Sequence, residues 1–139
     1  MRNTLYIVWH DDNNLDIAII DEQHRAIVSI INSLHYFMLT GHGNEIIKPT
    51  TVMLAQYENI HFQTEEAIMA EASYPAFEEH VALHKALQRK IKELSIDANM
   101  NKDSMIIFKF LKEWWLDHVN KEDRKYAPYV KKLIDSKTF

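Results

Sequence analysis

The chain has no cysteine and contains only 2 glycines and 3 prolines in 139 residues. Without cysteine it forms no disulfide, zinc ribbon, iron–sulfur cluster or thiolate-ligated haem. With so little glycine and proline, few positions can interrupt a helix. No apolar run approaches the roughly 18 residues of a membrane span, and the N-terminus lacks the pattern of a signal peptide. We therefore expect a soluble, cytoplasmic protein with no membrane span.

Composition and charge further limit the kind of protein that this chain can be. The formal net charge is −4, which argues against nucleic acid as a partner. Hydrophobic residues make up 47% and charged residues 26%, as in ordinary globular proteins. The length suits a single domain over residues 1–139. The 8 histidines are more than a purely structural chain needs, so the leading hypothesis is a helical bundle with a histidine-based site.

Apolar residues recur at helical spacing from Ile20 onward, after an N-terminal arm over residues 1–19. The spacing predicts an all-α fold in which a bundle over residues 20–126 is followed by a tail over residues 127–139, with a short helix after Pro128. We expect the second helix to begin near Pro49, the third to span about residues 76–95, and a polar loop to cover residues 97–103. Short connections favour antiparallel neighbours, so the prediction is an up-down-up-down four-helix bundle.

This topology brings chemically similar side chains to one end of the bundle. Five histidines and one glutamate lie on inward stripes there: His24, His61, Glu65, His80, His84 and His118. A single histidine on an apolar stripe is more often a core residue than a ligand. Several unpaired imidazoles and a carboxylate would be costly to bury together, and a metal that binds their lone pairs removes that cost. The i,i+4 spacing within two of the helices also points both side chains of each pair the same way.

Asp123 has two interpretations. It lies five residues after His118, and residues five apart on an ideal helix differ by roughly 140° in direction. It can join His118 at a metal only if the helix unwinds or bulges there, as helices do at functional sites. Alternatively it is one acid in a solvated charged run over residues 121–125. Spacing alone does not choose between these.

Several segments resemble the signature of the hemerythrin family, in the right order from about Trp9 to Tyr126, and the arm around Trp9 is similar to bacterial members. They are Asp21-Glu22-Gln23-His24, His61-Phe62-Gln63-Thr64-Glu65-Glu66, Tyr74-Pro75, His80-x-x-x-His84 and His118-Val119-Asn120-Lys121-Glu122-Asp123. All seven ligand positions of the family are occupied.

The resemblance implies a non-haem di-iron centre (Fe2+/Fe3+) with an oxo or hydroxo bridge that binds dioxygen reversibly. Carried over to this chain, His80, His84 and His118 hold one iron, His24 and His61 hold the other, and Glu65 and Asp123 bridge the two. The second iron then has an open position for dioxygen. The resemblance also implies an apolar oxygen pocket lined by Ile27, Phe62, Leu87, Trp114, Trp115 and Val119.

Two pocket positions depart from the family pattern, because Trp115 replaces the usual leucine and Leu87 replaces a common aromatic residue. One interpretation is an exchange of volume across the pocket, which packed cores tolerate best when it is compensated. The other is that Trp115 turns outward and packs on a neighbouring helix. Asp16 stands where the family has a glycine, so we expect the arm to differ in path. Tyr126 is expected to pack near the site, with its hydroxyl bonded if buried.

The functional hypothesis is oxygen binding without catalysis, for carriage and storage or for oxygen or redox sensing. Sensing would require a covalently linked output domain or a protein partner in signalling. The ligand set favours this over oxidase chemistry, because ferritin-like di-iron oxidases use four carboxylates, whereas this chain offers five neutral imidazoles and two carboxylates. The alternatives are a di-iron peroxidase or nitric oxide reductase, and an iron-buffering bundle.

Overall fold

The computed structural model describes residues 5–136, and these residues form helices and no strand. The helices are η1 (Asp11–Asn13), α1 (Ala18–Leu39), α2 (Gly43–Glu71), α3 (Phe77–Asn101), α4 (Ser104–Glu113), the π-helix η2 (Trp114–Glu122) and α5 (Asp123–Ser136). None of the helices in this part of the chain combines the length and the apolar character that a membrane crossing requires.

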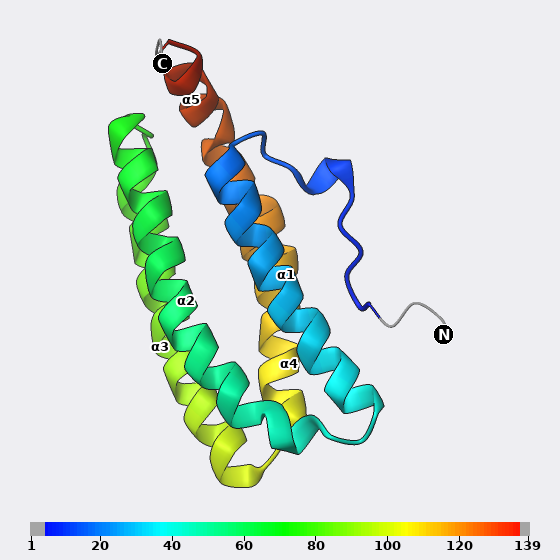
Figure 1. The fold of residues 1–139 in the computed structure, drawn as a ribbon. Coiled ribbons are helices and arrows are strands. Elements are labelled where there is room, and N and C mark those ends of the chain that lie inside the picture. Colours follow the sequence, from blue (N-terminus) through cyan, green and yellow to red (C-terminus); the bar gives the residue numbers. More distant parts are fainter. Residues whose placement is uncertain (1–4, 137–139) are drawn as a thin grey trace.

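Four helical rods form an antiparallel bundle, which confirms the predicted fold class (Figure 1). α1 packs on α2 and α4, α3 packs on the same two helices, and α2 also contacts the fourth rod through α4 and α5. The fourth rod is continuous, because α4 passes through η2 into α5 (Figure 1). The main core runs along the bundle axis and includes Ile31, Leu54, Ile91 and Leu111, all 1% exposed or less. Burial of these apolar stripes drives the rods together.

α2 begins at Gly43, not near Pro49 as predicted, and Pro49 lies inside the helix. Close packing explains the early start. A Cβ added at Gly43 would lie 2.5 Å from Oγ of Ser104, so only glycine allows α2 to approach the start of α4 this closely. Gly41 has a different role: it lies just after the end of α1 and has a left-handed φ of 79°, a conformation that commonly ends a helix.

The predicted polar loop over residues 97–103 is wrong, because α3 continues to Asn101. Ala98 is fully buried, so packing holds the segment in the helix in spite of its polar neighbours. The helix ends at Lys102, which adopts a left-handed φ of 50°. Asp103 then starts α4 by accepting a hydrogen bond from the backbone N–H of Met105 at 3.1 Å.

The predicted start of the tail helix, after Pro128, is also wrong. α5 begins at Asp123 directly after η2, and Pro128 lies within it. Proline removes one backbone N–H from the helix, and the carbonyl of Arg124 that would have accepted it belongs to an exposed residue that water can reach. The helix is described to Ser136, and residues 137–139 of the predicted tail lie outside the described part.

The N-terminal arm lies along α1 and the fourth rod (Figure 1). It ends two residues earlier than predicted, because α1 starts at Ala18, and residues 1–4 lie outside the described part. Asp16, which stands where the resemblance would place a glycine, has a left-handed φ of 62°. Aspartate tolerates this conformation better than most residues, and Asp21 accepts hydrogen bonds from the backbone N–H groups of Leu15 and Asp16 at 2.7 and 3.0 Å.

Candidate metal centre

The side chains predicted to bind metal come from every rod of the bundle. α1 supplies one, α2 two, α3 two and the fourth rod two. They are His24, His61, Glu65, His80, His84, His118 and Asp123, and each is 5% exposed or less. The structure thus brings all seven together at one end of the bundle, where the sequence analysis expected them. His42, by contrast, is exposed and paired with Glu45.

The π-helix η2 decides the direction of Asp123. Its wider turn places the backbone N–H of Asp123 against the carbonyl of His118, five residues earlier. The carboxyl group of Asp123 therefore enters the interior beside His118 and is 0% exposed. Of the two interpretations of this residue, the bulged helix is the one found, and the solvated acid is not.

The ligand atoms form two overlapping groups. One contains Glu65, His80, His84, His118 and Asp123, and the other contains His24, His61, Glu65 and Asp123. Within each group the candidate ligand atoms all lie within 4.8 Å of one another. Only the two carboxylates belong to both groups, so the arrangement can hold two neighbouring metal ions bridged by carboxylates.

The two oxygens of Asp123 point to different groups. Oδ1 lies 2.9 Å from Nε2 of His118 and 3.1 Å from Nε2 of His80. Oδ2 lies 3.0 Å from Nε2 of His24. A carboxylate that offers one oxygen to each group has the geometry of a bridging ligand.

Glu65 also lies between the groups. Its Oε1 is 2.8 Å from Nε2 of His61 and 3.6 Å from Nε2 of His84. Its Oε2 accepts a hydrogen bond of 2.7 Å from the hydroxyl of Tyr126, which is 0% exposed. The buried Tyr126 hydroxyl thus has the partner that the sequence analysis required, and it orients the carboxylate.

The buried atoms of this cluster fit a metal better than they fit one another. Six of them have no hydrogen-bond partner in spite of their short contacts: Nε2 of His61, His80, His84 and His118, Oε1 of Glu65 and Oδ1 of Asp123. Ligand atoms about 2.1 Å from one ion in octahedral geometry lie about 3.0 Å apart, close to most of the contacts found here. Lone pairs that converge at this spacing without hydrogen bonds are typical of a metal site.

Outer partners hold two of the histidine rings. Nδ1 of His61 lies 2.8 Å from Oε1 of Gln23, and Nδ1 of His84 lies 3.0 Å from Oε2 of Glu66. An acceptor at Nδ1 keeps the proton there and leaves the Nε2 lone pair free for a metal. The sequence left the roles of Gln23 and Glu66 open, because residues adjacent on a helix point in different directions.

The charges of the cluster compensate one another. Burial raises the pKa of Asp123, but His118, His24 and His80 outweigh it and hold that pKa well below its usual value. Burial and then Asp123 also raise the pKa of Glu65, but its histidine contacts leave the pKa lowered. Burial lowers the pKa of His84, which favours the neutral imidazole that a metal needs. Both pKa directions favour ionised carboxylates, which would balance the positive charge of a bound metal.

The residues predicted to line an oxygen pocket all belong to the main core or pack against it. Phe62 stacks on His84, with ring centres 4.0 Å apart, and its edge faces Trp114 at 5.7 Å. Ile27 and Val119 are buried in the same core, and Leu87 is partly buried against it.

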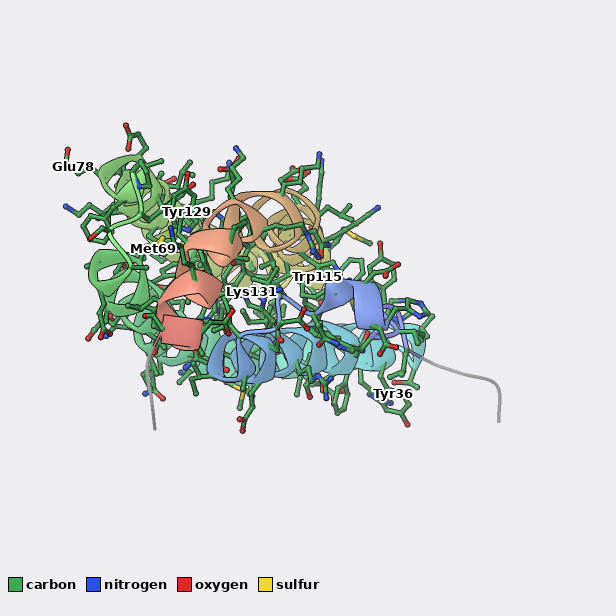
Figure 2. The ribbon with its side chains drawn as sticks, turned by 90° about the horizontal axis from the view of Figure 1, so that it is seen from above. Tyr36, Met69, Glu78, Trp115, Tyr129 and Lys131 are labelled. Atoms are coloured by element: carbon green, nitrogen blue, oxygen red, sulfur yellow. The ribbon has the colours of Figure 1, made fainter. Side chains whose placement is uncertain are left out.

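Trp115 is 5% exposed and packs on the arm, with its ring centre 5.9 Å from that of Trp9 (Figure 2). The ring contact of Trp115 is thus with the arm, whereas the second interpretation placed it against a neighbouring helix.

One buried acid, Glu58, was not predicted from the sequence. Glu58 is 7% exposed, its Oε2 has no hydrogen-bond partner, and burial raises its pKa to about 7. It lies on the inward stripe of α2, between Leu54 and His61. That stripe was the signal that could have found it.

Comparison with known proteins agrees with this geometry. The family model described as the hemerythrin HHE cation binding domain matches residues 15–130. The bacteriohemerythrin of Stenotrophomonas maltophilia is 31% identical over 126 residues, which cover 90% of this chain and 82% of that protein. The bacteriohemerythrin of Pseudomonas aeruginosa is 31% identical over 127 residues, covering 91% and 82%. That of Methylococcus capsulatus is 30% identical over 118 residues, covering 81% and 87%. This chain belongs to the hemerythrin family.

Proposed function

We propose that this protein binds dioxygen reversibly at a non-haem di-iron centre. In this proposal the chain is one hemerythrin domain, in which His80, His84 and His118 hold one iron and His24 and His61 hold the other. Glu65 and Asp123 would be shared by the two irons, and the centre would also carry an oxo or hydroxo group. The same reversible binding would serve a free carrier or store, and equally the oxygen-sensing domain of a larger signalling protein.

The observation that carries the proposal is the pair of ligand groups with both carboxylates in common. Three histidines belong to one group and two to the other, so the second metal has one protein ligand fewer. An open position on a metal is where an exogenous molecule binds. The oxygens of Asp123, one toward each group, support the bridging role.

The chain's own residues prepare the site. Bound iron supplies the exchange of electrons with dioxygen. The acceptors at Gln23 and Glu66 fix two histidine rings. Burial and the nearby Glu65 carboxylate raise the pKa of Tyr126 well above its usual value, so its hydroxyl keeps its proton and donates a hydrogen bond to Glu65. Phe62, fully buried against His84, excludes water from that side of the cluster.

The ligand set supports binding and not catalysis. Five imidazoles and two carboxylates carry less negative charge than the four carboxylates of ferritin-like oxidases. Less negative charge stabilises high oxidation states of iron less. Dioxygen is therefore expected to be held intact and released.

Anaerobic loading with ferrous iron tests the proposal. We expect two irons per chain, and a visible absorption band that appears when oxygen is admitted and disappears when it is removed. The variant His61→Ala should lose iron and the band. His42→Ala is the matched control, because His42 is exposed and outside the cluster, and it should behave as the parent protein.

Other results would contradict the proposal. If the protein bound no iron, we would infer that the buried histidines have a structural role only. Immediate and irreversible conversion to the ferric form would favour redox sensing or an oxidase-like role over reversible oxygen binding.

A further inference from the structure

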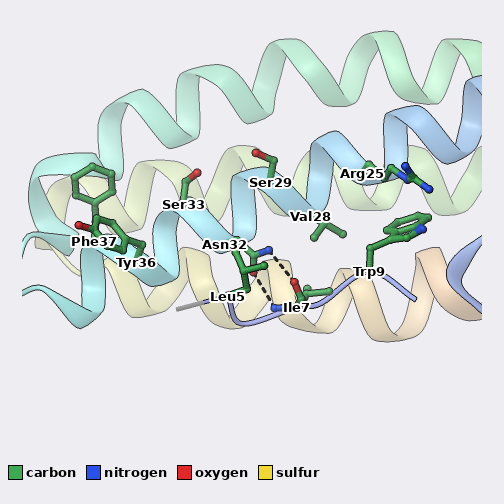
Figure 3. Close-up of a pocket in the computed structure, with 10 residues that line it drawn as sticks. All are labelled: Leu5, Ile7, Trp9, Arg25, Val28, Ser29, Asn32, Ser33, Tyr36 and Phe37. Carbon is green, nitrogen blue, oxygen red and sulfur yellow. Dashed lines mark hydrogen bonds between the residues drawn. The ribbon is translucent and has the colours of Figure 1, made fainter. Parts of the chain in front are cut away.

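A surface groove of about 540 Å³ lies between the N-terminal arm and α1 (Figure 3). The arm contributes apolar side chains, among them Ile7 and Trp9, and α1 contributes Arg25 at one end and Tyr36 and Phe37 at the other. We call it the arm groove. It lies outside the metal centre, and the proposed oxygen binding gives it no role.

The arm is held in a defined position beside α1, so the groove has a fixed wall. The side chain of Asn32 makes two hydrogen bonds with the backbone of Ile7, accepting from its N–H and donating to its carbonyl, each at 2.8 Å (Figure 3). Tyr6 adds an edge contact to Phe108 of α4, with ring centres 5.0 Å apart. A wall tied by both backbone and side-chain contacts can define a binding site.

Arg25 provides a cation at one end of the arm groove. Its guanidinium carbon lies 5.0 Å from the centre of the Trp9 ring (Figure 3). The indole N–H of Trp9 donates to Asn14 at 3.2 Å. Stacking on a fixed ring orients the guanidinium. Arg25 is exposed and forms no ion pair with any carboxylate in residues 5–136.

The nearby acidic side chains do not neutralise the charge of Arg25 by direct contact. Asp21 and Glu22 line a neighbouring hollow together with Arg25, but neither forms a salt bridge with it within residues 5–136. The oxygens of Asp21 already accept hydrogen bonds from the backbone of the arm. The guanidinium therefore keeps its hydrogen-bond donors for another acceptor, and a planar carboxylate matches their fork geometry.

We propose that the arm groove binds a free alkyl carboxylate, with the carboxylate on Arg25 and the alkyl chain along α1 toward Phe37. The twelve residues between these two positions span about 18 Å of helix, so the site suits an extended chain. Ile7, Val28 and Phe37 supply apolar contact along this path.

The charge of the chain favours a free molecule over a membrane surface. The formal net charge is −4, and anionic bilayers attract clusters of four or more basic residues, not a single arginine. The groove is lined by one cation only, Arg25. One carboxylate for one guanidinium is the stoichiometry that this arrangement supports.

Decanoate titrated into the full-length protein tests the proposal, with tryptophan fluorescence and calorimetry as readouts. We expect saturable binding of one decanoate per chain and a change in the fluorescence of Trp9, which contacts Arg25. Decanol, which lacks the charge, should bind about tenfold more weakly. Acetate, which lacks the chain, should not bind.

Two variants localise the site. Arg25→Gln should weaken decanoate binding about tenfold or more, because it removes the charge-assisted hydrogen bonds. Arg89→Gln is the matched control, since Arg89 is an exposed arginine on α3 away from the groove. Ser33→Trp should block the chain path from an exposed position within the groove, and it keeps the test valid if Arg25→Gln folds poorly.

Three outcomes would overturn the proposal. The first is no saturable binding of decanoate below its micelle-forming concentration. The second is binding that neither Arg25→Gln nor Ser33→Trp changes while circular dichroism shows intact helices. The third is tighter association with vesicles of anionic phospholipid than with free decanoate, which would make the groove a lipid-surface contact.

Discussion

At the scale of single residues, the histidines of the cluster use their two ring nitrogens differently. The Nε2 atoms face the two carboxylates, and Nδ1 of His61 and of His84 each has an outer acceptor. The outer acceptors decide which nitrogen carries the proton, and thus which lone pair is free. Residues outside the ligand set should therefore change metal affinity.

Replacing Gln23 by leucine tests this. The change removes the acceptor that lies 2.8 Å from Nδ1 of His61, so we expect iron affinity to fall about 10- to 100-fold. Competition with a chelator of known affinity measures the loss. Thr64→Ala is the control, because Thr64 accepts from the Gln23 amide at 3.2 Å and donates to the carbonyl of Ile60 at 2.8 Å, so its loss leaves the Gln23 acceptor in place and its effect should be smaller. Unchanged affinity in Gln23→Leu would remove the assigned role of this hydrogen bond.

Glu58 makes a pH-dependent contribution to stability. Its pKa is raised from 4.5 to about 7 in the folded protein because it is buried. Between these values the unfolded chain loses the proton while the folded chain keeps it, so stability falls as pH rises from about 4.5 to about 7. The loss from this group is complete above about pH 7.

The variant Glu58→Gln should remove that loss. We expect it to gain stability relative to the parent protein between pH 5 and pH 8, by about 3 kcal/mol at most. Urea unfolding of the metal-free proteins at both pH values measures the difference. Glu93→Gln, at an exposed position of α3, is the control and should show little pH-dependent difference. An equal pH response in the two variants would rule out the role assigned to Glu58.

At the scale of elements, the π-helix is what allows one rod to supply both His118 and Asp123. A regular helix would place them on different faces, whereas η2 brings both into the interior. A π-helical segment contains one residue more than the α-helix that would replace it.

Deleting Asn120 should therefore be tolerated. The deletion places the carboxylate of Asp123 four residues after His118, and residues four apart share a face of an α-helix. We expect the variant to keep its bound iron, with ultraviolet circular dichroism unchanged. Deleting Lys109 from α4 is the control, because there the loss rotates core residues such as Leu111 out of register. Loss of iron in the Asn120 deletion alone would show that the wide turn itself is required.

At the scale of the whole molecule, the candidate ligands join all four rods toward one end of the bundle, and the tight contact of Gly43 with Ser104 lies at the other end (Figure 1). A metal that binds the folded state and not the unfolded state stabilises the fold by mass action. Stability and iron content are thus expected to be linked.

Removing iron with a chelator should lower the melting temperature by roughly 10–20 °C, since a ligand at 1,000 times its Kd adds about 4 kcal/mol. Hydrogen exchange should accelerate first at the ligand end of α1 and α3, around His24 and His84, and later around Gly43. Calorimetry and exchange measurements on both forms check this. An identical melting temperature with and without iron would contradict the metal-binding role of the cluster.

The sequence by itself determined the number and direction of the rods and the end at which the histidines gather, because these depend on apolar periodicity and short connections, which are local properties of the chain. The tertiary structure decided features that depend on packing between distant segments. It extended α2 back to Gly43 against Ser104, continued α3 through the buried Ala98, and turned Asp123 inward through η2. It also paired Trp115 with Trp9 of the arm. No local pattern encodes such contacts, since their free energy comes from burial against residues far away in the chain.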